Sequence, residues 1–330
     1  MHKEDHFATL AAHLAAIGEP KRSEILDYYR EMVCDQMEDG RSEEEVLAAL
    51  GDPEELARKI VAEAELLAVA QPETPPAGDE GRLYPATAPA RSVRVLAKDT
   101  KVLVERVADG PVRVLFEPRD YDRVEVEERD GVFTFRQSVR GIHVLVLGDL
   151  FSSPRRVILQ LPADFTGDVE VTTSNARIAA RDLGELGNVT IATSNARLSL
   201  SGLRCGALVL KTSNGSMDLA DARGTSCAMT TSNSRLTASG VRFPVRLELR
   251  TSNGSIAVED GGSDDVRLTT SNSGIRATLA GDVRAYSIHS YTSNGKNNLP
   301  PDWPCPGSDK RLNVTTSNAK IDVTFAPEGE

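Results

Sequence analysis

The residues of this chain that could do chemistry are few and scattered. None of its five histidines stands in an HExxH or similar metal-binding pattern. The sequence contains no nucleophile elbow (GxSxG), dinucleotide-binding GxGxxG loop, P-loop or calcium loop. The four cysteines lie far apart without a CxxC pair, and we interpret them as reduced thiols: Cys34, Cys205, Cys227 and Cys305. We therefore expect no catalytic, cofactor-binding or metal-binding residue, and no cofactor.

The strongest polar pattern is the tripeptide Thr-Ser-Asn, which occurs eight times at spacings of 20, 19, 19, 20, 19, 22 and 24 residues. Its asparagines are Asn175, Asn195, Asn214, Asn233, Asn253, Asn272, Asn294 and Asn318. Its threonines are Thr173, Thr193, Thr212, Thr231, Thr251, Thr270, Thr292 and Thr316. Such even spacing predicts a repeat architecture with equivalent residues stacked one above another.

Stacked asparagines have a definite chemistry, because each amide N–H can donate to the carbonyl oxygen of the next amide. Strand alternation places the asparagine and threonine of each motif on the inward side. An unpaired buried amide would cost about 1–3 kcal/mol, so we expect a buried, structural asparagine ladder with a parallel threonine ladder. The functional alternative, a row of ligand-binding amides, would require exposed asparagines.

The elements that position these residues follow from the flanking sequence. Apolar residues alternate on both sides of each motif, as Val169 and Val171 do before the first copy and Ile178 and Ala180 after it. This pattern predicts a strand, a turn just after the asparagine and a second strand. The predicted fold is mainly β: a single-chain β-solenoid (β-helix) over residues 92–330, with coils about 4.8 Å apart.

The N-terminal part has a different pattern. Residues 1–70 predict a small helical bundle, including a helix over 20–40. Ser42 and Glu45 form a capping-box pattern, and Asp52 precedes Pro53 at the start of a further helix. Residues 71–91 are rich in proline and predict a semi-extended linker between the two domains.

The negative charge belongs to the N-terminal part. Residues 1–70 hold 17 acidic and 7 basic residues, whereas the whole chain has a net charge of −11. A module of this charge repels phosphate backbones and anionic lipid, so we expect no nucleic-acid partner. No apolar stretch is long enough for a membrane helix, and no signal peptide is visible, so we expect a cytoplasmic protein without a membrane span.

The outward positions of the repeats leave two questions open. A broken basic row follows the asparagines at Arg177, Arg197, Arg235, Lys296 and Lys320. It is either solvated charge or an attraction for an acidic partner. The loop over residues 299–307, which holds the only tryptophan, is either a local cap or a partner-binding loop.

The Thr-Ser-Asn repeats from about residue 92 to 326 resemble the adhesin-type β-solenoid domain of unknown function. The first 65 residues resemble the HTH-associated α-helical signalling domain, through Gly40, the Ser42-Glu43-Glu44-Glu45 start and the Leu50-Gly51-Asp52-Pro53-Glu54 run. The resemblance implies a bacterial protein whose gene neighbours often include a PadR-type transcriptional regulator, which is thereby a candidate partner. In that family membrane helices often join the two domains, whereas this chain has the proline-rich linker.

These patterns predict a non-enzymatic scaffold or signalling protein. The acidic bundle binds a protein partner, and the β-solenoid is an interaction or assembly platform, with a homo-oligomer left open. One alternative is a cell-surface adhesin that binds glycan or protein. Another is a polysaccharide-active enzyme, which would need acids gathered on one face, but the outward acids Glu170, Asp218, Glu248 and Asp322 are isolated.

Overall fold

The structure is a computed structural model that describes residues 3–15, 17–19, 22–23, 25–26, 29–30, 33, 42–69, 81–119, 122–139 and 156–327. They divide into two compact units: a helical unit, which holds the described residues up to 69, and a β unit, which holds the described residues from 81 onward. Cys34, most of the predicted helix over 20–40 and the first part of the predicted linker lie outside the described residues. No helix in the described part of the chain combines the length and apolar character that a membrane crossing requires.

Two helices of the helical unit begin where the capping residues predict. Its helices are α1 (Lys3–His13), α3 (Glu43–Leu50) and α4 (Pro53–Val69). The Ser42 side chain accepts from the Glu45 backbone N–H while the Glu45 carboxylate accepts from the Ser42 N–H. The Asp52 carboxylate accepts from the first N–H groups of α4 at 2.9 and 3.0 Å. These bonds satisfy donors that a helix start leaves unpaired.

A buried histidine, His6, lies on α1 of the helical unit. Its side chain is fully buried, and neither ring nitrogen has a hydrogen-bond partner among the described residues. Burial lowers the pKa of His6 from its ordinary value of 6.5, an effect that the nearby Asp52 charge partly offsets. His6 therefore binds a proton near pH 6.5 in the unfolded chain, whereas in the folded unit it stays neutral to lower pH.

We expect the helical unit to lose stability as the pH falls below 6.5. Hydrogen exchange of α1 amides in the full chain, corrected for intrinsic pH dependence, measures this as opening that increases between neutral and mildly acidic pH. His6→Phe should remove the increase, whereas His13→Ala, at an exposed position, should retain it. Equal pH dependence in wild type and His6→Phe would contradict the assignment.

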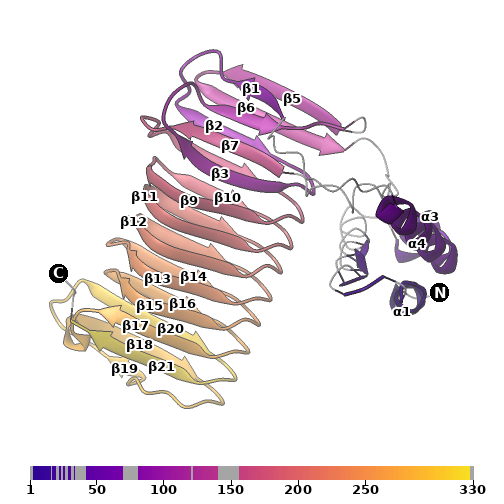
Figure 1. The fold of residues 1–330 in the computed structure, drawn as a ribbon. Helices are drawn as coiled ribbons and strands as arrows, with labels where there is room; N and C mark the ends of the chain where they lie inside the picture. The colour runs from indigo at the N-terminus through magenta and orange to yellow at the C-terminus, as the bar shows by residue number, and fades with distance from the viewer. Residues whose placement is uncertain are drawn as a thin grey trace. The chain divides into compact units, whose positions relative to one another are not determined.

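The β unit is a layered stack of strands (Figure 1) that forms one continuous hydrogen-bonded sheet. Its first strands are β1 (Arg82–Pro85), β2 (Ser92–Leu96), β3 (Lys101–Val107), β4 (Arg113–Phe116), β5 (Asp122–Arg129), β6 (Val132–Val139) and β7 (Arg156–Pro162). The middle strands are β8 (Asp168–Thr172), β9 (Ile178–Glu185), β10 (Val189–Ala192), β11 (Leu198–Lys211), β12 (Met217–Thr230), β13 (Leu236–Arg242), β14 (Arg246–Arg250) and β15 (Ile256–Gly262). The last are β16 (Asp265–Thr269), β17 (Ile275–Ala280), β18 (Tyr286–Thr292), β19 (Asp302–Trp303), β20 (Lys310–Thr316) and β21 (Ile321–Ala326), with a 3-10 turn at Val283–Ala285.

Seven of the eight Thr-Ser-Asn motifs join two strands of one layer, and the motif that ends at Asn294 follows β18 without a second strand. On the side that we call the β16 side, the parallel order is β6, β2, β8, β10, the second halves of β11 and β12, β14, β16, β20 and β18. On the β17 side it is β7, β3, β9, the first halves of β11 and β12, β13, β15, β17 and β21. Alternate apolar residues of both sides, such as Val171 and Ile178, are buried in a single core. The predicted alternation and mainly β class are confirmed.

The layers do not follow chain order at either end. The β2–β3 layer lies between the β6–β7 layer and the β8–β9 layer, although it precedes both in sequence. At the other end, β20 lies between β16 and β18. The asparagine spacing contains no information about this exchange of order, because a parallel layer of the same motif fits at either position.

The predicted linker over 71–91 is too long at its C-terminal end. β1 pairs in antiparallel register with β4, and Ala86 is buried in the core of the β unit. Glu128 orders the following segment, because its carboxylate accepts from the Thr87 N–H, the Thr87 hydroxyl and the Ala88 N–H. Residues 82–91 therefore belong to the β unit, which begins before the predicted residue 92. Proline content marks an extended backbone but does not separate a linker from an edge strand.

Candidate functional site

The asparagines of the eight motifs form a continuous row of hydrogen bonds. In the order of the layers, each Nδ2 donates to the Oδ1 of the neighbouring residue at 2.6–2.9 Å. The row begins at Asp99, whose carboxylate accepts from Asn175 at 2.7 Å. It runs through Asn195, Asn214, Asn233, Asn253 and Asn272 to Asn318 and ends at Asn294. The row therefore records the exchanged order of the last two layers.

The prediction that these amides are buried is wrong. Asn175 and Asn195 are half-buried, and the other asparagines are exposed: Asn214, Asn233, Asn253, Asn272, Asn294 and Asn318. Strand alternation stops at Thr173 and its equivalents, because the next two residues form the corner and turn the chain to the other side. The amides thus lie at the rim of the stack. Each amide within the row donates one N–H to the layer on one side and accepts, at its carbonyl oxygen, from the layer on the other side.

The threonines of the motifs are placed inward but do not bond to one another. Most are buried, and Thr292 of the terminal layer is half-buried. Each hydroxyl lies near a backbone carbonyl of the neighbouring layer, as Thr193 Oγ1 donates to Ser174 O at 2.9 Å and Thr212 Oγ1 to Ser194 O at 3.0 Å. Rather than a hydroxyl ladder, the threonines form a column of links between side chain and backbone that satisfies the buried hydroxyls.

The residue after each asparagine alternates between layers in the middle of the stack. A Cβ built on Gly254 would lie 1.7 Å from Ser234 O, and one on Gly215 would lie 1.8 Å from Ala196 O. In a neighbouring layer, Ser273 keeps its side chain and donates to Asn253 O at 2.8 Å. The structural repeat at this corner is therefore a pair of layers rather than one.

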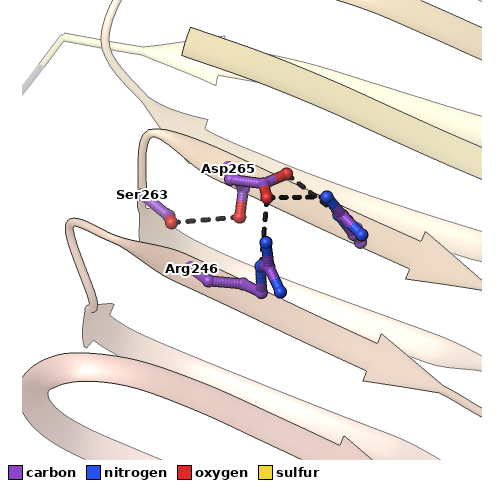
Figure 2. Close-up of polar contacts among 4 residues, drawn as sticks. Arg246, Ser263 and Asp265 are labelled. Carbon is purple, nitrogen blue, oxygen red and sulfur yellow. Dashed lines mark hydrogen bonds and ion pairs between the residues drawn. The ribbon is translucent and has the colours of Figure 1, made fainter. Parts of the chain in front are cut away.

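Charged side chains gather on the outward surface of the last layers. Figure 2 shows Asp265 on β16 with Arg246 on the neighbouring strand β14 and Ser263 in the turn before β16. Asp265 accepts from Arg246 Nε at 3.0 Å and from Arg267 at 3.0 and 3.1 Å. Burial would raise the pKa of the Asp265 carboxyl, but the hydrogen bonds and charges of Arg267 and Arg246 outweigh it, and the pKa is lowered. This carboxylate joins β14 to β16.

We call the outward surface of β14, β16, β20 and β18 the C-terminal outer face. It is defined by Arg246, Arg250, Asp265, Arg267, Arg311 and Tyr291. In-register pairing aligns Arg250 with Thr269, Thr315 and Tyr291 across these strands. Arg250 and Arg311 form no ion pair among the residues that the structure describes. The face therefore carries cationic groups that are free to meet a partner.

The terminal layer adds one aromatic group to this surface, Tyr291, which is 54% exposed. Trp303 is 51% exposed, but it lies opposite the buried Ile288 on the β18–β19 pair and so is not part of the outward row. His289 Nδ1 lies 2.7 Å from Asp302 Oδ1 across the β18–β19 pair. The loop over 299–307 lies over the end of the stack, where Leu299 is buried and Pro301 O accepts from the Ser290 N–H at 2.8 Å. The loop covers the end of the core, as the first predicted role requires, and also leaves its tryptophan half exposed, as the second requires.

The basic row and the outward acids are partly neutralised by each other. Arg197 Nε lies 2.7 Å from Asp218, and Lys320 Nζ lies 2.6 Å from Asp322. Glu170 is paired with Arg94 at 2.7 Å. Ordinary ion pairs, within a layer for Lys320–Asp322 and between neighbouring layers for the other two, thus account for several of these positions. Exposed pairs of this kind contribute little to stability.

Cysteines and grooves complete the inventory of chemical groups. Cys205, Cys227 and Cys305 are free thiols, and burial raises the pKa of Cys205 to about 11 and that of Cys227 further. In the described ranges, no three histidine, cysteine or acidic side chains cluster closely enough to hold a metal ion.

A groove of about 640 Å³ lies near β4 and β7, lined by residues of 86–91, 110–112 and 162–167.

Comparison with known proteins identifies related families. The HAAS family matches residues 6–59, and the Toastrack DUF4097 family matches residues 95–323. One similar solved structure is a Clostridium sporogenes protein provisionally described as a cell adhesion protein. It is 8% identical, covers 75% of this chain and 99% of its own, and has a TM-score of 0.22. No curated protein matches the chain.

Proposed function

We propose, from the premise that this chain belongs to the Toastrack DUF4097 family, that it is a non-enzymatic scaffold or signalling protein. In this proposal the stacked layers form a β-solenoid that acts as an interaction or assembly platform. The helical unit, which carries the HAAS match, binds a protein partner. The family name assigns no activity, so the argument depends on the surfaces that this chain presents.

The observation that carries the proposal is the fixed arrangement of the C-terminal outer face. Parallel register holds its side chains in rows, and the asparagine row links successive layers at the rim. A surface that is already ordered avoids the entropy of ordering side chains and loops on binding. Arginine and tyrosine, which this face presents, are among the residue types enriched at protein interfaces and their energetic centres. These features support a protein partner at this face.

The charge of the helical unit supports a second contact. Residues 1–70 carry 17 acidic and 7 basic residues, which favours a basic protein surface and disfavours phosphate backbones. A PadR-type regulator is the candidate that the family resemblance offers. We place this interaction in the cytoplasm, and fractionation of the cells that make the protein would test that location.

Quantitative affinity purification with the full chain tests the platform. The test variant is Arg250→Glu/Arg311→Glu on the C-terminal outer face. The matched control is Arg177→Glu/Arg235→Glu, which changes two exposed arginines on the β17 side by the same charge. We expect the test variant to reduce recovery of a direct protein partner at least about tenfold, as loss of central interface charges does, with the control near wild type.

Three outcomes would contradict the proposal. Equal loss in both variants would assign the effect to net charge, and unchanged recovery in both would remove the face from binding. Selective capture of a glycan by the same face would favour the adhesin alternative.

A further inference from the structure

One layer of the stack is formed by strands that come later in the sequence than the strands on both sides of it. After β16 and β17, the next strand, β18, does not pair with β16. β20 lies between them and is paired in parallel with both, from Asp265↔Arg311 to Thr269↔Thr315 and from Tyr286↔Lys310 to Thr292↔Thr316. β21 pairs with β17 over its whole length. The C-terminal layer, β20–β21, is therefore an inserted layer.

This inserted layer supplies every kind of contact that holds the stack together. Leu312, Val314 and Ile321 are fully buried in the common core. Asn318 donates to Asn272 at 2.8 Å and accepts from Asn294 at 2.9 Å. Without the layer, two rows of backbone groups and the core between them would lack partners, at a cost that native proteins avoid.

The contacts that hold the layer do not specify which copy of the chain supplies it. Most of them run between β20–β21 and its two neighbouring layers, and Asn298 of the connecting loop adds a reciprocal pair of hydrogen bonds with Val323. Pro304 and Pro306 restrict the backbone of this loop. An exchanged dimer keeps the strand pairing of the inserted layer and changes the loop segment before β20, whose hydrogen bonds join Cys305 and Ser308 to residues 284–287. Strand exchange is inexpensive when so few bonds change.

We propose that this layer is filled in trans: β20–β21 of a second copy inserts between β16–β17 and β18, and the exchange is reciprocal. The Lys310–Asp264 ion pair at 3.4 Å and the hydrogen bond from Arg311 N to Asp264 O then join the two copies. The inference deepens the proposed assembly function by naming its partner as a second copy of this chain. The inference rests on the proposed function only in taking assembly as the role of the stack. The test below does not involve the partner of the C-terminal outer face.

A cross-link that only exchanged copies can form tests the proposal. Two full-length chains are prepared with the native cysteines replaced by alanine or serine. One carries Tyr291→Cys and the other Thr315→Cys, at positions opposite each other on β18 and β20. The two are refolded together and treated with a short bismaleimide. Each copy has one thiol, so a covalent dimer that contains one of each chain requires that β20 of one copy lies beside β18 of the other.

The control pair is Thr230→Cys with Arg250→Cys, which face each other on β12 and β14 in the interior of the stack. Exchange of the C-terminal layer cannot bring these two positions together. We expect at least about tenfold more mixed covalent dimer from the test pair than from the control pair, because exchange concentrates the two thiols at one site. Mixed dimer at the control level would overturn the proposal.

Native mass spectrometry of the unmodified full chain provides a second test that does not depend on the folding of the cysteine variants. After refolding at high protein concentration, we expect a dimer that persists when the sample is diluted, because release requires the layer to unfold locally. A monomer at every concentration would overturn the proposal regardless of the cross-linking result. Loss of outer-face binding with an intact exchanged dimer would instead contradict only the proposed function.

Discussion

Gly254→Ala should unfold the middle of the stack, although alanine occupies the same position in other Thr-Ser-Asn copies. The added Cβ would lie 1.7 Å from the backbone oxygen of Ser234, and a backbone atom in a paired layer cannot move aside. Relief requires the two layers to separate, so we expect destabilisation of at least about 3 kcal/mol. This outweighs the gain of about 0.4–1 kcal/mol that replacing glycine gives through the unfolded chain. Urea unfolding of the full chain measures the difference.

The matched control is Ser273→Ala, one layer further along the chain. This position already carries a Cβ, and the change removes only the hydrogen bond from the serine hydroxyl to Asn253 O. We expect a loss of about 1 kcal/mol. Hydrogen exchange should show that Gly254→Ala exposes amides in the layers on either side of the corner. Similar stabilities for Gly254→Ala and wild type would contradict the alternation of layers.

The sequence predicts local structure here better than layer order. Alternate apolar residues identify the strands, and capping residues identify the starts of α3 and α4. The order of layers at the ends could not be predicted, because β18 and β20 carry the same motif and both suit a layer beside β16. The choice depends on the loop between them and on the capping bonds of Asn298 with Val323, which have no periodic pattern.

The error about the asparagines has a different physical origin. Period-two alternation applies only while the backbone stays extended, and it ends at the threonine of each motif. Past that residue the side-chain direction depends on the corner. The row of amide hydrogen bonds needs only a constant corner in successive layers, and it forms at the rim as it would in the core.

No pattern in the sequence points to Arg106. It stands on β3 among ordinary strand residues, yet its guanidinium donates to four backbone carbonyls, those of Pro162, Phe165, Leu183 and Glu185, at 2.5–2.7 Å. These carbonyls come from the end of β7, the loop after it and the corner of β9. Burial lowers the pKa of Arg106, and the Asp164 charge opposes that shift. Only the planar fork of arginine reaches so many acceptors at once.

Arg106→Met should therefore destabilise the N-terminal layers by about 4 kcal/mol, because several carbonyls in a partly buried site lose a charged donor together. Arg106→Lys should recover only part of the loss, since an ammonium group has three donors on a tetrahedral centre. The matched control is Arg181→Met on β9, an exposed position, where we expect a change within about 0.5 kcal/mol. Urea unfolding with hydrogen exchange should place the weakened amides at β3, β7 and β9. A cost below about 1 kcal/mol for Arg106→Met would mean that water replaces the guanidinium at these carbonyls, and that the layers are held by their core and backbone pairing alone.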